Sequence, residues 1–273
     1  MLRVGTLLLA GTLAVVSTSG FAADLAYRKA PLPADPAFNW SGFYVGVNAG
    51  GGWYDGRGFA GSSNVTSLVP AGSIVSFPPN PARNDPGVTV GGLAGYNYQI
   101  GSLVLGAEAD FNYADLKSRH SGGVTTICCG GAVDTLSYDS RSQLDWFGTM
   151  RARLGFLPTA RLLIYATGGL AYGEVERSLQ EATVIPAIAV ARYWQGSASD
   201  VRVGWTAGGG AEYALTSAIT VRAEYLYLDL GKSSVTANYV GTFPAAPLQT
   251  QIYYASSHDN KFNIARAAIA YKF

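Results

Sequence analysis

Eight segments of the chain alternate apolar residues with polar or small ones at a period of two. In the clearest of them, Leu103, Leu105 and Ala107 lie on one face, and Glu108 and Asp110 on the other. A period of two places successive side chains on opposite faces of a β-strand. The chain therefore predicts a sheet with one apolar and one polar face. The segments are Phe43–Ala49, Val88–Gln99, Leu103–Asn112, Asp145–Leu154, Leu162–Gly173, Arg202–Glu212, Thr220–Tyr227 and Phe262–Phe273.

The lengths of these segments and of their connections favour a membrane barrel. Strands of roughly 10–13 residues suit a tilted membrane crossing, which needs about 9–11, whereas a soluble sandwich uses about 5–6. Short periplasmic turns and long extracellular loops are the rule in outer-membrane barrels. We therefore predict an all-β fold, a closed eight-stranded antiparallel transmembrane barrel of up-and-down topology with four long extracellular loops. Short links are expected at Gln99–Ser102, Leu157–Arg161 and Thr216–Ala218, and long loops at about Tyr54–Pro86, Ala114–Ser142, Glu174–Asp200 and Gly231–Asp259.

Aromatic residues sort by strand end when the strands are run up and down. Two aromatic girdles are expected at the two membrane interfaces of a barrel, with small and aliphatic residues between them. The predicted periplasmic girdle is Phe43, Tyr96, Tyr98, Phe156, Tyr213, Tyr271 and Phe273. The predicted outer girdle is Trp53, Phe111, Tyr113, Trp146, Tyr172, Trp205, Tyr225 and Tyr227.

The beginning of the chain resembles an export signal. Arg3 gives a positive start, Val4–Val16 is a short apolar run, and small residues precede a cleavage position after Ala22. A spanning helix would need about 20 apolar residues. We predict a signal peptide at residues 1–22, a flexible proline-containing periplasmic segment at 23–39 and an outer-membrane barrel domain at 40–273.

Composition argues against nucleic-acid binding and catalysis. Acidic and basic residues nearly balance, 18 against 19, so there is no basic field for a nucleic acid. The two histidines, His120 and His258, fall in expected loops beside serines. Adjacency in sequence does not make a triad, because nucleophile, base and orienting group must meet in space. We expect no enzymatic activity, no cofactor and no metal site.

The polar face of the barrel encloses charged residues. An eight-stranded barrel has an interior only wide enough for its own side chains, so an ion-paired plug is expected, with a narrow gated channel as the alternative. If Leu215 lies opposite Ile219, Glu212 lies opposite Arg222, and unlike charges in that position attract. The predicted lumen network is Glu108, Asp110, Arg151, Arg153, Arg202, Glu212, Arg222 and Glu224.

Cys128 and Cys129 are adjacent in an expected surface loop. Free exposed thiols do not persist in an oxidising environment. A vicinal disulfide is one prediction, and a bridge to another molecule or local disorder are the alternatives. A vicinal bridge would be strained and easily reduced.

Four stretches resemble a known family, and together they extend over the mature chain: Trp40–Gly50, Gly95–Gln99, Tyr165–Gly173 and Tyr271–Phe273. They resemble the porin-like, opacity-type small barrels of Gram-negative bacteria, and more narrowly the alphaproteobacterial outer-membrane immunogenic proteins. The resemblance implies location in the outer membrane and antigenic loops. The chain end also resembles the signal that the barrel-assembly machinery recognises, which would be carried by Arg266, Ala268, Tyr271 and Phe273.

These observations predict a structural outer-membrane protein that displays antigenic or adhesive loops and contributes to envelope integrity. The expected partners are outer-membrane lipid, lipopolysaccharide and, during insertion, the barrel-assembly machinery. One alternative function is a narrow porin-like channel. Another is a surface receptor whose loops bind a host ligand or haem.

Overall fold

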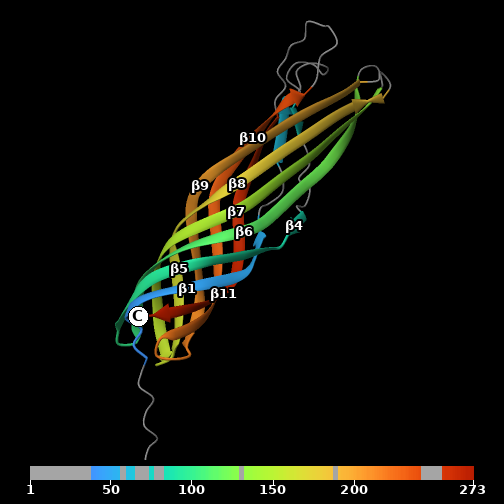
Figure 1. Cartoon of the computed structure of the whole chain (residues 1–273). Helices are drawn as coiled ribbons and strands as arrows, with labels where there is room; N and C mark the ends of the chain where they lie inside the picture. The colour runs from blue at the N-terminus through green and yellow to red at the C-terminus, as the bar shows by residue number, and fades with distance from the viewer. Residues whose placement is uncertain are drawn as a thin grey trace, which may run out of the picture. The chain divides into compact units, whose positions relative to one another are not determined.

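Eight long antiparallel strands close into a ring in the computed structural model (Figure 1). The structure describes residues 38–55, 60–64, 74–76, 83–128, 132–186, 190–240 and 254–273. The predicted signal peptide lies outside these residues. The ring strands are β1 (Gly42–Tyr54), β5 (Gly87–Ile100), β6 (Leu103–Cys128), β7 (Ala132–Thr159), β8 (Leu162–Ile185), β9 (Val190–Ala214), β10 (Ile219–Val240) and β11 (Tyr254–Lys272). Each strand pairs with the next, and β11 pairs with β1, from Tyr44–Lys272 to Tyr54–Phe262, so the sheet has no edge within the barrel.

Three short connections confirm the up-and-down topology. They join β5 to β6, β7 to β8 and β9 to β10 at the predicted places. Gly101 begins the first turn with a φ of 60°, a conformation that glycine adopts without a steric penalty. In the third turn, the Thr216 hydroxyl accepts hydrogen bonds from the backbone N–H groups of Ala218 and Ile219. In the predicted orientation these turns mark the periplasmic end of the barrel, and the opposite end is the outer end.

The four long connections lie at the predicted end of the barrel, but three of the predicted loops are largely strand, and for them the loop prediction was wrong. These three are Ala114–Ser142, Glu174–Asp200 and Gly231–Asp259. The β6–β7 ladder continues to Cys128–Ala132, and the β8–β9 ladder continues to Ile185–Val190. We call the parts of β6 to β11 beyond the outer aromatic girdle the extension. Both faces of the extension contain polar residues, because its outer face is not covered by lipid. The apolar alternation that marks the membrane strands is therefore lost there.

The connection between β1 and β5 contains three short strands. They add to the wall of the extension, beyond the ends of β1 and β5. They are β2 (Ala60–Asn64), β3 (Ile74–Ser76) and β4 (Arg83–Asp85). Strand β2 pairs with β11, β3 pairs with β2, and β4 pairs with β6.

The outer wall of the barrel has the apolar character that lipid requires. Alternate residues such as Val47, Leu105 and Met150 are exposed on it, whereas their neighbours in sequence point inward. Ring contacts join members of each predicted girdle, Phe43 with Tyr96 at 4.7 Å near the periplasmic end and Phe111 with Trp146 at 5.4 Å near the outer end. No helix in the described part of the chain is long and apolar enough to cross a membrane.

The inward residues of β10 show that the interior is layered. From the periplasmic end they are Arg222 and Glu224, then three leucines ending at Leu230, then Ser233, and finally Val235 and Ala237. The order of charged, apolar and polar residues recurs on β11, where Arg266 is followed by Ile264 and Phe262 and then by Asn260. The barrel is thus filled by side chains of alternating chemical character.

Candidate functional site in the filled lumen

Four carboxylates and four arginines form a charged layer across the lumen. It consists of Glu108, Asp110, Arg151, Arg153, Glu212, Arg222, Glu224 and Arg266. Five different strands contribute these side chains, and none is more than 4% exposed. The formal charges of the layer cancel. This balance is what allows so many ionised groups to be buried, because an unpaired buried charge is very unfavourable.

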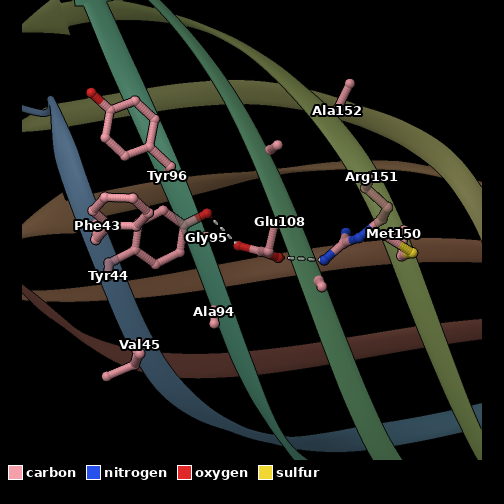
Figure 2. Close-up of a pocket in the computed structure, with 12 residues that line it drawn as sticks. Phe43, Tyr44, Val45, Ala94, Gly95, Tyr96, Glu108, Met150, Arg151 and Ala152 are labelled. Carbon is pink, nitrogen blue, oxygen red and sulfur yellow. Dashed lines mark hydrogen bonds and ion pairs between the residues drawn. The ribbon is translucent and has the colours of Figure 1, made fainter.

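Glu108 on β6 is the centre of the charged layer. Its carboxylate pairs with Arg151, with Arg222 at 2.6 Å and with Arg153 at 3.5 Å. The Tyr44 hydroxyl donates a further hydrogen bond to it at 2.8 Å. Figure 2 shows Tyr44, Glu108 and Arg151 on the inner side of the wall and the side chains of Val45 and Ala152 on the other side. One carboxylate therefore connects β1, β6, β7 and β10.

Arg222 and Glu212 lie opposite each other in the β9–β10 register, as predicted. Their side chains do not form the predicted ion pair, however. The guanidinium of Arg222 extends to Glu108, while Glu212 pairs with Arg153 at 2.7 Å and accepts a hydrogen bond from Thr220 at 2.6 Å. An arginine side chain is long enough to span a narrow lumen, so its partner need not be its cross-strand neighbour.

A second group of ion pairs lies around Arg266 on β11. Its guanidinium contacts Asp110 at 2.9 Å and Glu224 at 2.6 Å. Arg151 contacts the same two carboxylates, each at 2.9 Å. Sequence reasoning assigned Arg266 to the assembly signal and missed this role. The sequence contained evidence for this role, because Arg266 has the same parity as Ala268 and Ala270, which face inward.

Arg202 was predicted to belong to this network, and the structure places it elsewhere. It lies on β9 in the extension, where it pairs with Asp200 at 2.9 Å and its side chain is 32% exposed. Trp205 on the same strand belongs to the outer girdle. Arg202 lies on the outer side of Trp205, and therefore outside the membrane part of β9. Arg202 has the same parity as Glu212, the member of the charged layer on β9, but it lies too far along the strand to join that layer.

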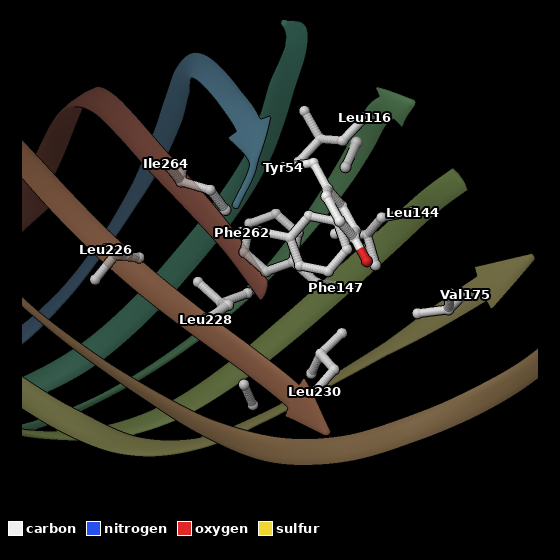
Figure 3. Packing of buried hydrophobic residues seen from close by; sticks show 12 residues of the cluster. Tyr54, Leu116, Leu144, Phe147, Val175, Leu226, Leu228, Leu230, Phe262 and Ile264 are labelled. Carbon is white, nitrogen blue, oxygen red and sulfur yellow. The ribbon is translucent and has the colours of Figure 1, made fainter. Parts of the chain in front are cut away.

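An apolar layer closes the charged layer toward the outer end, and we call it the outer seal. Figure 3 shows its packed side chains, among them the rings of Tyr54, Phe147 and Phe262. The rings of Tyr54 and Phe262 meet edge to face at 5.1 Å. Full burial of each large apolar side chain contributes about 1.5–3 kcal/mol. The members are Tyr54, Ala114, Leu116, Leu144, Phe147, Ala171, Val175, Leu226, Leu228, Leu230, Phe262 and Ile264.

The segment before β1 closes the periplasmic end. Trp40 is 1% exposed and packs with Phe38 against Val104, Leu163 and other inward side chains. The indole N–H of Trp40 donates to the Ala160 carbonyl oxygen at 3.3 Å. We call this cluster of Phe38, Trp40, Val104, Leu163, Tyr165 and Ala214 the periplasmic seal. Residues 38 and 39, which were expected to belong to the flexible segment, therefore lie with the barrel.

The remaining predicted sites fall in three places. Tyr271 and Phe273 face outward in the periplasmic girdle, with their rings 5.3 Å apart. Cys128 is the last residue of β6, whereas Cys129 lies outside the described residues. The histidines are not in loops as predicted, since His120 lies on β6, buried and facing inward, and His258 lies on β11.

A hollow on the outer wall belongs to the membrane face and not to the lumen. It has a volume of about 590 Å³ and is lined on the outward side by Val45, Ala94, Ala107, Ala109 and Ala152 (Figure 2). These short side chains leave a depression that lipid chains can fill. Glu108 and Arg151 also belong to its lining, but their side chains point into the lumen and are 0% exposed.

The closed ring, the lipid-facing apolar wall and the two girdles define a small outer-membrane β-barrel. Residues 11–273 match the model of the outer membrane protein beta-barrel domain. The chain belongs to this family and is an outer-membrane protein.

Two curated relatives narrow the family to the one that the sequence motifs predicted. The 31 kDa outer-membrane immunogenic protein of Brucella melitensis is 35% identical over 247 residues, which is 84% of this chain and 89% of the relative. The 22 kDa outer membrane protein of Rhizobium leguminosarum is 29% identical over 197 residues, covering 72% of this chain and 67% of the relative. Among solved structures, OprG of Pseudomonas aeruginosa aligns with 88% of this chain and 99% of its own, at 12% identity and a TM-score of 0.45.

Proposed function

We propose that this protein is a structural barrel, closed to diffusion, that holds the extension above the membrane as a surface for antigenic or adhesive contacts. The observation that carries the proposal is the order of layers inside the barrel. The charged layer lies between the outer seal and the periplasmic seal. Ions or polar solutes would have to displace two apolar layers and break a balanced ion-pair network to pass, which argues against a porin-like channel.

The extension supports the display part of the proposal. The β6–β7 and β8–β9 ladders continue through its described part, so these strands present a fixed surface. Lys117 and Arg141 are exposed on its outer face, beside Asp115 and Asp139. A rigid surface with charged side chains suits recognition because little conformational entropy is lost on binding.

We also propose that the protein has no catalytic role. His120 faces the interior, whereas its neighbour Ser121 is exposed on the opposite face of β6, so they do not form a dyad. Asp259 is held by Lys261 at 3.4 Å and by Lys232 at 3.8 Å. These engagements support a structural role for the residues that could have formed a hydrolytic site.

The experiment separates the barrel from the extension. In a strain that lacks the gene, the full chain is compared with a variant whose hairpins are shortened at two paired positions. Leu116 is joined to Leu144, and Val175 to Asp200, each by a two-residue turn, because these residues are register partners.

We expect the shortened variant to restore detergent resistance but to lose recognition by antibodies raised against intact cells and binding to host cells. Unchanged surface recognition would contradict the display role. Failure of the full chain to restore detergent resistance would contradict the structural role. A saturable small ligand that requires the extension would favour the receptor alternative.

A further inference from the structure

Arg177 is a buried cation that has no carboxylate partner among the described residues. It lies on β8, just beyond the outer seal, and is 4% exposed. Arg151, Arg153, Arg222 and Arg266 are equally buried, but each of them pairs with at least one carboxylate. The part of the chain that the structure describes places no carboxylate within ion-pair distance of Arg177. Its surroundings therefore differ from those of every arginine in the charged layer.

The contacts of Arg177 are all with neutral groups. One terminal nitrogen donates to the Ser233 carbonyl oxygen at 3.3 Å, and the other donates to Asn260 Oδ1 at 2.6 Å. A third hydrogen bond joins it to the Tyr54 hydroxyl. His120 faces it from β6, and burial together with the guanidinium charge lowers the pKa of His120, which favours the neutral imidazole. A neutral imidazole does not balance the charge of Arg177.

Two buried groups at this place have no hydrogen-bond partner among the described residues. They are the Arg177 Nε–H and the hydroxyl of Ser142, which is the register partner of Arg177 on β7. Both groups can donate a hydrogen bond. Two donors beside an uncompensated positive charge are the chemistry that an anion requires, and a cation or an apolar ligand would not satisfy them.

An arginine cannot remove its charge by losing a proton under physiological conditions. Burial of a charge without a partner costs several kcal/mol, and an anion from solution can supply the partner that the described residues do not. Arg177 lies between the outer seal and the apolar cluster around Leu179 and Trp194, so a small ion suits this position better than a larger ligand.

The wall beside Arg177 lacks backbone pairing at the seam between β9 and β10. The ladder between these strands is interrupted between the pair Asp229–Trp205 and the pair Asn238–Gln195. Within the interruption, the carbonyl oxygens of Lys232 and Ser233 accept hydrogen bonds from the side chains of Arg202 and Arg177. The side chain of Arg202 is 32% exposed there, so this seam has one guanidinium partly exposed to solvent and another, that of Arg177, buried inside.

We propose that a small inorganic anion, chloride under ordinary conditions, binds beside Arg177 inside the extension and enters through the β9–β10 seam. The anion accepts hydrogen bonds from the Arg177 Nε–H and the Ser142 hydroxyl. By neutralising the guanidinium, it stabilises the connection that Arg177 makes between β8, β10 and β11.

The test is urea unfolding of the full chain in lipid vesicles while gluconate is replaced by chloride at constant ionic strength. At a chloride concentration ten times the dissociation constant, the folding equilibrium constant should rise about elevenfold. Above that concentration the free energy of unfolding should increase with the logarithm of the chloride concentration. Arg177→Met should remove this dependence. Arg141→Gln is the matched control, because Arg141 is 61% exposed and pairs with Asp139, and it should respond to chloride as the wild type does.

A second measurement does not depend on the folding of any variant. Crystals of the wild-type protein grown with bromide in place of chloride should show an anomalous peak beside Arg177 and Ser142. The proposal is overturned if no peak appears there, or if Arg177→Met folds and keeps the chloride dependence of the wild type.

Discussion

Arg222 on β10 pairs across the lumen with Glu108 on β6 at 2.6 Å, although Glu212 is its direct neighbour on β9. The two carboxylates are thus related to Arg222 in different ways, one by backbone register and the other by contact of the charged atoms. An assignment from backbone pairing alone would give the ion-pair energy of Arg222 to Glu212, whereas the charged atoms of Arg222 contact Glu108. The distinction can be measured, because each relation predicts a different energetic coupling.

Arg222→Ala should destabilise the folded barrel by about 3–5 kcal/mol, because it removes one partner of a buried ion pair. Double-mutant cycles of Arg222→Met with Glu108→Gln and with Glu212→Gln identify the partner. Residues in contact show coupling of about 0.5–3 kcal/mol. We expect the larger coupling with Glu108, measured by urea unfolding in lipid vesicles. A larger coupling with Glu212 would contradict the observed pairing.

Trp40→Ala should destabilise the barrel by about 3–5 kcal/mol, because it empties the periplasmic seal. Trp53→Ala provides the control, since Trp53 lies in the outer girdle and is 41% exposed. The same urea titration should give a clearly smaller loss for the control. Equal losses would mean that Trp40 contributes no more than an exposed tryptophan does.

Much of this architecture could be predicted from sequence alternation, and its failures have physical causes. Lipid on one face and a filled lumen on the other make the alternation sharp, so the register of Glu212 and Arg222 was predictable. Trp40 precedes the first alternating segment, and nothing in a period of two indicates that a residue before a strand folds into the barrel. In the extension, residues such as Ser137 and Ser140 are polar on both faces, so the strands there resembled loops.

Sequence alternation also failed to predict the outer seal. Leu226 and Leu228 have the inward parity of Arg222 and Glu224, but Tyr225 and Tyr227 on the other face are also largely apolar. Where both faces are apolar, alternation no longer distinguishes them. Continuing the parity from the charged residues would have placed both leucines in the lumen.

Glu181 should make the stability of the extension depend on pH. It lies on β8 between its register partners Tyr138 and Trp194, and burial raises the pKa of its carboxyl to about 8. The folded state keeps the proton when the unfolded state has lost it, so stability is greatest below the unfolded pKa of about 4.5 and falls as the pH rises to about 8.

Glu181→Gln should remove this contribution and stabilise the protein relative to the wild type above pH 8, by at most about 5 kcal/mol. The measurement is urea unfolding in vesicles from pH 5 to pH 9. Glu176→Gln is the control, because Glu176 is an exposed carboxylate on the same strand. If both variants show the pH profile of the wild type, Glu181 is not the group responsible.

Deletion of Phe273 should sharply reduce the amount of folded barrel in the outer membrane. The Phe273 side chain is 73% exposed in the periplasmic girdle, and its backbone N–H donates to the Phe43 carbonyl oxygen at 3.0 Å. The residue thus contributes to closure of the β1–β11 seam, and it ends the proposed assembly signal. Heat-modifiable, folded protein is quantified in isolated membranes, where levels equal to the wild type would contradict this role.

The central claim is that the lumen is closed by a balanced charged layer between two apolar seals. It is tested most directly by recording ion conductance of the purified, folded protein in planar lipid bilayers. We predict no steady conductance for the wild type at either polarity. Steady, reproducible channel openings whose ion selectivity changes in Arg222→Ala, without a loss of stability in that variant, would contradict the claim and show that the charged layer lines an open pore.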